Sequence, residues 1–123
     1  MKSTRILVVD DHALFRMGVA TLLRDTEGFT VVGEARDGRE AVARAQTLTP
    51  DVVLMDIYMP KFDGWEATRR LKADEATRGI PVIIMTAVLS KALLAQVREC
   101  GAARVITKPF VDCDIKRLMN WIA

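Results

Sequence analysis

Four short apolar runs in this chain each lead into residues whose side chains can bind a cation or a phosphoryl group. The runs cover residues 6–9, 52–55, 82–85 and 105–107, and the polar residues that follow them are Asp10 and Asp11, Asp56, Thr86, and Lys108. Continuous apolar runs of this length are typical of strands that are buried on both faces of a parallel sheet. Because ligands of open parallel sheets bind beyond the carboxyl ends of the strands, we expect these polar residues to meet at one edge.

A helical spacing of apolar residues follows each expected strand, and after the first strand it groups Leu14, Phe15, Val19, Leu22 and Leu23. Residues 30–35 are expected to form a weaker strand, the second in chain order. Three polar residues are suited to begin helices and one glycine to end a helix: Asp37, Asp63 and Ser90, and Gly101. The last helix is expected to carry Ile115, Leu118, Met119 and Ile122. Five strands alternating with five helices predict a doubly wound α/β fold, with a parallel sheet covered on both faces. We expect residues 1–123 to form a single domain.

Composition excludes several classes of function. The charge of +2 is too small to indicate nucleic-acid binding by this domain. No apolar stretch is long enough for a membrane span, and the first residues lack the pattern of a secretory signal. Cys100 and Cys113 lack the spacing of a zinc site or a disulfide framework, so we expect reduced thiols and a cytoplasmic location.

The residues at the strand ends predict a site for phosphoryl transfer. Two carboxylates about 4 Å apart repel by roughly 4 kcal/mol at an effective dielectric constant near 20, so three of them need a cation. Mg²⁺ prefers oxygen ligands and pairs one or two carboxylates with phosphate oxygens. Asp10 and Asp11 can serve the metal, while Lys108 adds a positive charge and Thr86 a hydroxyl donor. Asp56 stands alone and is the best candidate for a nucleophile that forms an aspartyl phosphate. Asp63-Gly64 is interpreted as a permissive turn that helps to hold the loop after Asp56.

Five motifs then occur in a characteristic order: Ile-Leu-Val-Val-Asp10-Asp11, Leu-Met-Asp56-Ile-Tyr-Met-Pro60, Asp63-Gly64, Thr86-Ala87 and Lys108-Pro109-Phe110. In these motifs the chain resembles the receiver domains of two-component response regulators, the CheY-like superfamily, over essentially its whole length. The resemblance implies a flavodoxin-like strand order, 2-1-3-4-5. It also implies a signalling switch, not an enzyme with a substrate of its own.

The resemblance assigns roles to individual residues. Asp56 would accept the phosphoryl group from a phosphohistidine on a sensor histidine kinase or a histidine phosphotransfer protein. Mg²⁺ would be held by Asp11, Asp56 and the backbone carbonyl of Tyr58, with Asp10 reaching it partly through water. Thr86 and Lys108 would bind the phosphoryl oxygens, and the Lys108–Pro109 peptide bond would be cis. An unknown downstream protein would dock on the face formed by the fourth helix, fifth strand and fifth helix.

Two other functions use similar residues. A phosphohydrolase with an aspartyl nucleophile would have an Asp-x-Asp motif on the first strand and a cap domain, whereas Asp10 and Asp11 are adjacent here and no cap is present. A pseudo-receiver would act as a scaffold without taking phosphate, and the presence of all five site residues argues against it. Whether the chain is a stand-alone receiver or part of a larger regulator stays open.

The chain departs from the family at Val105, where an aromatic residue usually stands three positions before the lysine. Valine has no ring to turn inward, so the switch is either read through the backbone after Thr86 or is weak.

Tyr58 and Val88 flank the expected phosphoryl site, two residues after Asp56 and Thr86. Neither side chain is a carboxylate or an amide that could position an attacking water, so we expect a comparatively long-lived phosphorylated form. Introducing polar groups with Tyr58→Asn and Val88→Glu should shorten that lifetime, measured as the loss of phosphoprotein by intact mass over time. An unchanged decay rate would reject this explanation.

Overall fold

The computed structural model describes residues 3–57, 63–87 and 89–107, in which strands and helices alternate along the chain. The strands are β1 (Thr4–Val9), β2 (Phe29–Ala35), β3 (Val52–Asp56), β4 (Val82–Thr86) and β5 (Arg104–Thr107). The helices are α1 (Ala13–Arg24), α2 (Gly38–Leu48), α3 (Gly64–Ala73) and α4 (Lys91–Cys100). The helix expected around Ile115 to Ile122 lies outside the described residues and stays a prediction.

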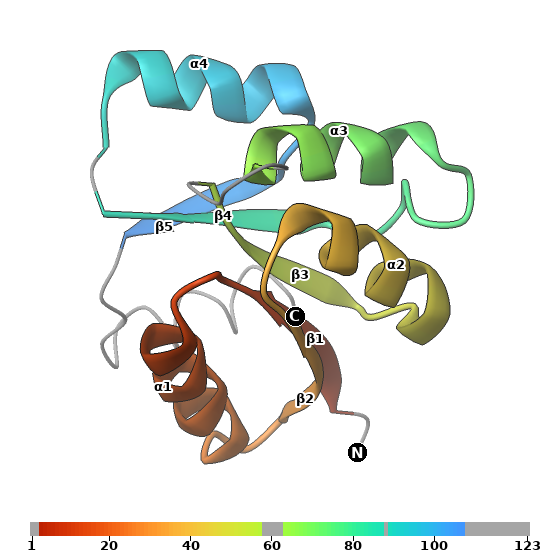
Figure 1. Cartoon of the computed structure of the whole chain (residues 1–123), viewed down its shortest axis with the longest axis vertical. Coiled ribbons are helices and arrows are strands. Elements are labelled where there is room, and N and C mark those ends of the chain that lie inside the picture. Colours follow the sequence, from red (N-terminus) through yellow and green to blue (C-terminus); the bar gives the residue numbers. More distant parts are fainter. Residues whose placement is uncertain (1–2, 58–62, 88, 108–123) are drawn as a thin grey trace.

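The five strands form one parallel sheet in the order β2-β1-β3-β4-β5. This confirms the predicted strand order and the doubly wound arrangement. Helices α2, α3 and α4 pack on one face of the sheet, and α1 packs on the other (Figure 1). Alternate residues of one strand therefore enter different cores: Leu7 and Val9 face α2–α4, whereas Ile6 and Val8 face α1.

The predicted helix caps are confirmed. The side chains of Asp37, Asp63 and Ser90 each accept a hydrogen bond from the backbone N–H three residues later, at 2.8, 2.9 and 3.1 Å. Gly101 follows α4 with a φ of 90°, the left-handed conformation that favours glycine at a helix end. Each cap satisfies backbone groups that the helix itself leaves without partners.

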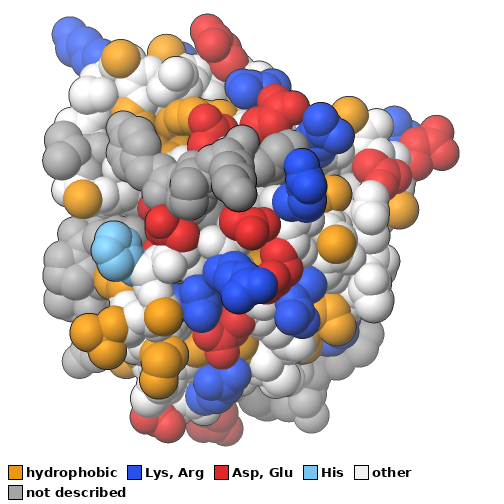
Figure 2. Space-filling view, in the orientation of Figure 1, with side chains coloured by type: hydrophobic (Ala, Val, Ile, Leu, Met, Phe, Trp, Pro, Cys, Tyr) orange, Lys and Arg blue, Asp and Glu red, His pale blue; other side chains and the backbone are white. Residues whose placement is uncertain are grey.

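The outer side of α1 differs from the sequence prediction. Leu14, which the helical spacing grouped with core residues, is 83% exposed, and Met17 is 58% exposed. These two residues are three positions apart and share a side of the helix that continues at exposed Thr21. Val19 and Leu23 make the contact with the sheet instead. Figure 2 shows hydrophobic side chains gathered at the corner of the molecule that α1 occupies in Figure 1.

The structure bears on the membrane span and on the cysteines discussed for the sequence. No helix in the described ranges is both long and apolar enough to cross a membrane. Cys100 is a free, buried cysteine, and burial raises the pKa of its thiol, which keeps it protonated and unreactive. Cys113 lies outside the described residues.

The turn from α2 into β3 contains a strained residue. Thr49 has φ 44° and ψ 61°, the only left-handed conformation among the described residues other than glycine. The guanidinium of Arg5 donates to the carbonyls of Leu48 and Thr49, both at 2.8 Å, and so holds the chain in this conformation. Left-handed backbone costs a residue with a Cβ about 1–2 kcal/mol, which glycine avoids.

We predict that Thr49→Gly raises the free energy of unfolding by roughly 0.5–1 kcal/mol, because relief of the backbone strain exceeds the extra entropy of an unfolded glycine. Thr47→Gly is the matched control: Thr47 is exposed inside α2, where glycine should lower stability by about 0.3 kcal/mol, the difference in helix propensity between the two residues. Urea denaturation measures both. A loss of stability in both variants would show that Thr49 is not strained.

Candidate functional site

The register of the sheet brings the carboxyl ends of the inner strands level with one another. Val9 is opposite Met55, so Asp10, the next residue, comes level with Asp56. Asp56 is opposite Met85, the residue before Thr86. The structure therefore brings Asp10, Asp56 and Thr86 to the same edge, as the sequence predicted.

Three of these polar residues are buried at the edge of the apolar core. The exposed fractions of Asp10, Asp56 and Thr86 are 0%, 4% and 1%. Burying carboxylates is unfavourable unless hydrogen bonds or opposite charges compensate them. Part of this compensation is local, because Asp10 Oδ1 accepts a hydrogen bond from the backbone N–H of His12 at 2.9 Å.

Among the described residues, Asp11 gives the strongest indication of a cation site. Its Oδ1 atom is buried and has no hydrogen-bond partner among the described residues. The imidazole Nδ1 of His12 lies 4.0 Å away, which is too long for a hydrogen bond. One ligand atom from each of Asp10, Asp11 and His12 fall within 4.8 Å of one another. An orphaned carboxylate oxygen beside a second carboxylate suits a hard divalent cation such as Mg²⁺, whose preferred ligands are oxygens.

Several predicted site features fall on residues that the structure does not describe. Lys108, the backbone carbonyl of Tyr58, the Lys108–Pro109 peptide bond and Val88 all lie outside the described ranges. The nearest described neighbour of Lys108 is Thr107, which is opposite Thr86 in the sheet. Strands β4 and β5 therefore end level with each other, and the last residue of β5 directly precedes Lys108.

Gly64 has a role that differs from the one predicted. It does not have a positive φ, so the turn needs no glycine for its conformation. Instead, a Cβ built on Gly64 would lie 2.3 Å from the backbone oxygen of Asp56 and 2.8 Å from the Cα of Ile57. The backbone N–H of Gly64 also donates to the carbonyl of Ile57 at 3.0 Å. The first residue of α3 therefore packs directly against the backbone of Asp56, where no side chain fits.

Sequence reasoning also missed Arg16 and Glu34. Arg16, on α1, donates from Nη1 to the backbone carbonyl of Asp10 at 2.7 Å and from Nε to Glu34 Oε1 at 3.1 Å. The one available signal was the position of Arg16 four residues, or about one helical turn, after His12, the residue that follows the acidic pair. Glu34 carried no signal in the sequence.

We predict that Gly64→Ala lowers the free energy of unfolding by about 1–3 kcal/mol, the usual cost of forcing an extra methyl group against packed atoms. Gly18→Ala, in α1, is the matched control. Its added Cβ meets nothing within 4 Å, so it should raise stability by about 0.5–1 kcal/mol. Urea denaturation compares the two variants. Equal effects would mean that the backbone of Asp56 moves aside without cost.

Comparison with known proteins agrees with this architecture. Residues 6–122 match the response regulator receiver domain family. The transcriptional regulatory protein PdtaR of Mycobacterium tuberculosis is 40% identical over 111 residues, which cover 90% of this chain and 52% of that protein. The chain thus spans about half the length of the curated relatives it matches.

Solved structures resemble the chain over almost its full length. The receiver domain of the response regulator NarL from Mycobacterium tuberculosis has a TM-score of 0.91 at 32% identity, covering 99% of this chain and 98% of that one. A chain of the CheX–CheY–BeF₃–Mg²⁺ complex from Borrelia burgdorferi has a TM-score of 0.86 at 28% identity, covering 99% and 91%. With its strand order and its acidic strand ends, the chain belongs to the receiver domains of response regulators, the signalling switches of two-component systems.

Proposed function

We propose that this domain, residues 1–123, is switched by phosphorylation of Asp56, with the phosphoryl group taken from a phosphohistidine in the presence of Mg²⁺. The buried Oδ1 of Asp11, which has no hydrogen-bond partner among the described residues, is the observation that carries the proposal. That oxygen lies at the same edge as the buried carboxylates of Asp10 and Asp56, an arrangement that would be unfavourable without a cation. The Borrelia burgdorferi relative, described with BeF₃ and Mg²⁺, supports the same chemistry.

Each predicted site residue would have its own role. Asp10 and Asp11 would hold the metal together with Asp56, and the carbonyl of Tyr58 would complete the protein ligands. Asp56 would use a carboxylate oxygen as the nucleophile. Thr86, buried at the end of β4, would donate its hydroxyl to a phosphoryl oxygen, and Lys108 would bind another. Mg²⁺, when bound, would neutralise charge on the phosphoryl oxygens.

The partners would be a sensor histidine kinase or a histidine phosphotransfer protein on the input side and an unknown protein on the output side. We place the output surface on α4 and β5, together with the helix expected after them. Arg98 and Arg104 are exposed there and give this surface a basic character. The cytoplasmic location expected from the cysteines stays a prediction, as does any further domain that the longer relatives contain.

Val105 limits how the switch can reach that surface. It is half-buried, lies opposite Ile84 in the sheet and packs against the core beneath α2–α4. A valine fixed in this way has no ring that could rotate when Thr86 moves. The expected route is therefore the backbone of β4 and the residues that lead from Thr86 to the start of α4 at Ser90.

The test is intact mass after incubation with Mg²⁺ and a small phosphodonor such as acetyl phosphate. We expect one phosphoryl group on the wild-type chain and none on Asp56→Asn. Asp25→Asn, which alters an exposed carboxylate at the end of α1, is the control and should label like wild type. Chelation of Mg²⁺ should abolish labelling.

Other outcomes would reject the proposal in distinct ways. A folded protein that never takes a phosphoryl group would be a pseudo-receiver scaffold. Continuous turnover of a generic phosphate ester would instead indicate a phosphohydrolase. Labelling that persists in Asp56→Asn would place the acceptor on another residue.

A further inference from the structure

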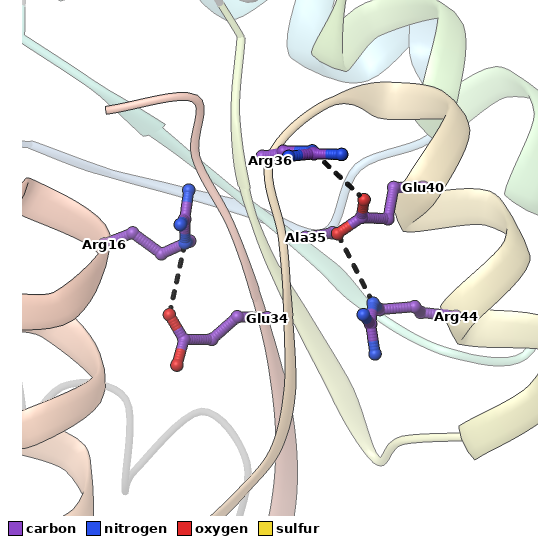
Figure 3. Close-up of a pocket in the computed structure, with 6 residues that line it drawn as sticks. All are labelled: Arg16, Glu34, Ala35, Arg36, Glu40 and Arg44. Atoms are coloured by element: carbon purple, nitrogen blue, oxygen red, sulfur yellow. Dashed lines mark hydrogen bonds and ion pairs between the residues drawn. The ribbon is translucent and has the colours of Figure 1, made fainter. Parts of the chain in front are cut away.

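A charged groove of about 480 Å³ lies between α1 and α2, over the carboxyl end of β2. Figure 3 shows its six lining residues, which are Arg16, Glu34, Ala35, Arg36, Glu40 and Arg44. Each glutamate pairs with two arginines: Glu34 with Arg16 and Arg24, and Glu40 with Arg36 and Arg44. In Figure 2, basic and acidic side chains interleave on this face of the molecule.

The two ion-pair groups of the groove differ in burial. Arg36, just before α2, and Arg44, on α2, both pair with Glu40 at 3.5 and 3.4 Å. Both arginines are exposed, so water screens the attraction and little stability results. The side chain of Arg16 is only 18% exposed, and its pair with Glu34 is shorter, at 3.1 Å. A largely buried arginine needs its hydrogen bonds, so Arg16 is the lining residue whose position the fold fixes most firmly.

Arg16 spans the distance from this groove to the acidic strand ends. Its Nε donates to Glu34 on β2, and its Nη1 donates to the backbone carbonyl of Asp10 at 2.7 Å. The N–H of Asp10 is also fixed, because it donates to the carbonyl of Ala35 at 3.0 Å. The peptide groups on both sides of the Asp10 Cα are therefore anchored, one to β2 and the other to α1.

We propose that Arg16, oriented by Glu34, is a positioning residue for the metal site, which holds the backbone at Asp10 so that the carboxylates of Asp10 and Asp11 converge. The inference rests on the proposed function, because it concerns the Mg²⁺ that this function requires. Groups that orient metal ligands without touching the metal typically contribute 10–100-fold to metal affinity. Glu34 has a second effect: it neutralises the guanidinium, so that a cation and Arg16 can lie near each other without strong repulsion.

The direction in which Mg²⁺ affinity changes when Arg16 is replaced separates positioning from simple electrostatics. Removing a positive charge near a cation site should tighten Mg²⁺ binding if charge alone matters. Removing a group that positions the ligands should weaken it. Arg16→Met keeps much of the length and apolar bulk of the side chain but loses both hydrogen bonds. Arg24→Met is the matched control, since Arg24 also pairs with Glu34, at 3.4 Å, but lies eight residues, about two helical turns, beyond Arg16 on α1.

The first measurement is Mg²⁺ affinity by isothermal titration calorimetry. We expect Arg16→Met to bind Mg²⁺ about tenfold more weakly than wild type, while Arg24→Met stays close to wild type. Tighter or unchanged binding in Arg16→Met would overturn the inference. An equal loss in both variants would also overturn it, because it would assign the effect to the charge balance at Glu34.

The second measurement needs no metal. Amide hydrogen exchange of His12 reports the hydrogen bond from its N–H to Asp10 Oδ1, and exchange of Val53, in the core strand β3, reports global unfolding. Arg16→Met should speed exchange at His12 severalfold more than at Val53, and Arg24→Met should not. Parallel changes at both amides would show a merely structural role and reject the inference. A wild-type chain that binds no Mg²⁺ would overturn the proposed function and the metal role of Arg16 with it, whereas a chain that binds Mg²⁺ equally well with and without Arg16 would overturn the inference alone.

Discussion

The burial of carboxylates at the end of an apolar sheet is the constraint on which the rest of this structure depends. Asp10 and Asp56 are level in adjacent strands and almost completely buried. Two such groups repel each other and lose their hydration, and neither effect is offset by the aliphatic side chains beneath them. The fold tolerates them only with backbone donors, precise strand register and, by our proposal, a divalent cation. Because burying these carboxylates is unfavourable until a positive charge compensates them, the site is well suited to bind Mg²⁺ together with a phosphoryl group.

The two helical layers each fix one of these aspartates through its backbone. On the α1 side, the guanidinium of Arg16 binds the carbonyl of Asp10. On the opposite side, Gly64 at the start of α3 leaves just enough space for the carbonyl of Asp56. Neither contact uses a carboxylate oxygen. The site is thus held by main-chain contacts from both faces of the sheet.

Much of the fold could be predicted because local sequence and tertiary structure agree. The apolar runs at residues 52–55 and 82–85 are buried throughout, and the caps at Asp63 and Ser90 begin helices as expected. The prediction was wrong in detail at Leu14, because periodicity shows that a helix has an apolar side but not which apolar residues the sheet can reach. The strand order came from family resemblance, since alternating strands and helices are compatible with several orders.

Within the site, only the residues at the carboxyl ends of the strands could be predicted from the sequence. The rule that ligands bind beyond parallel strands sufficed to place Asp10, Asp56 and Thr86 at one edge, and their roles there stay predictions. Gly64 looked like a turn glycine because sequence shows what a residue permits, not which backbone atom lies against it. The partners of Arg16 depend on tertiary register, which no local pattern specifies.

Glu34 shows why that register matters. Strand β2 contains a register shift: Ile6 is opposite Val31, but Leu7 is opposite Gly33, so β2 carries one extra residue. Glu34 is therefore level with Val8, whose side chain faces α1. Without the extra residue, Glu34 would be level with Val9 and would point toward α2, away from Arg16. A single-residue irregularity, the kind that often re-aims side chains near functional sites, thus turns an ordinary strand glutamate into the partner of the arginine that holds Asp10.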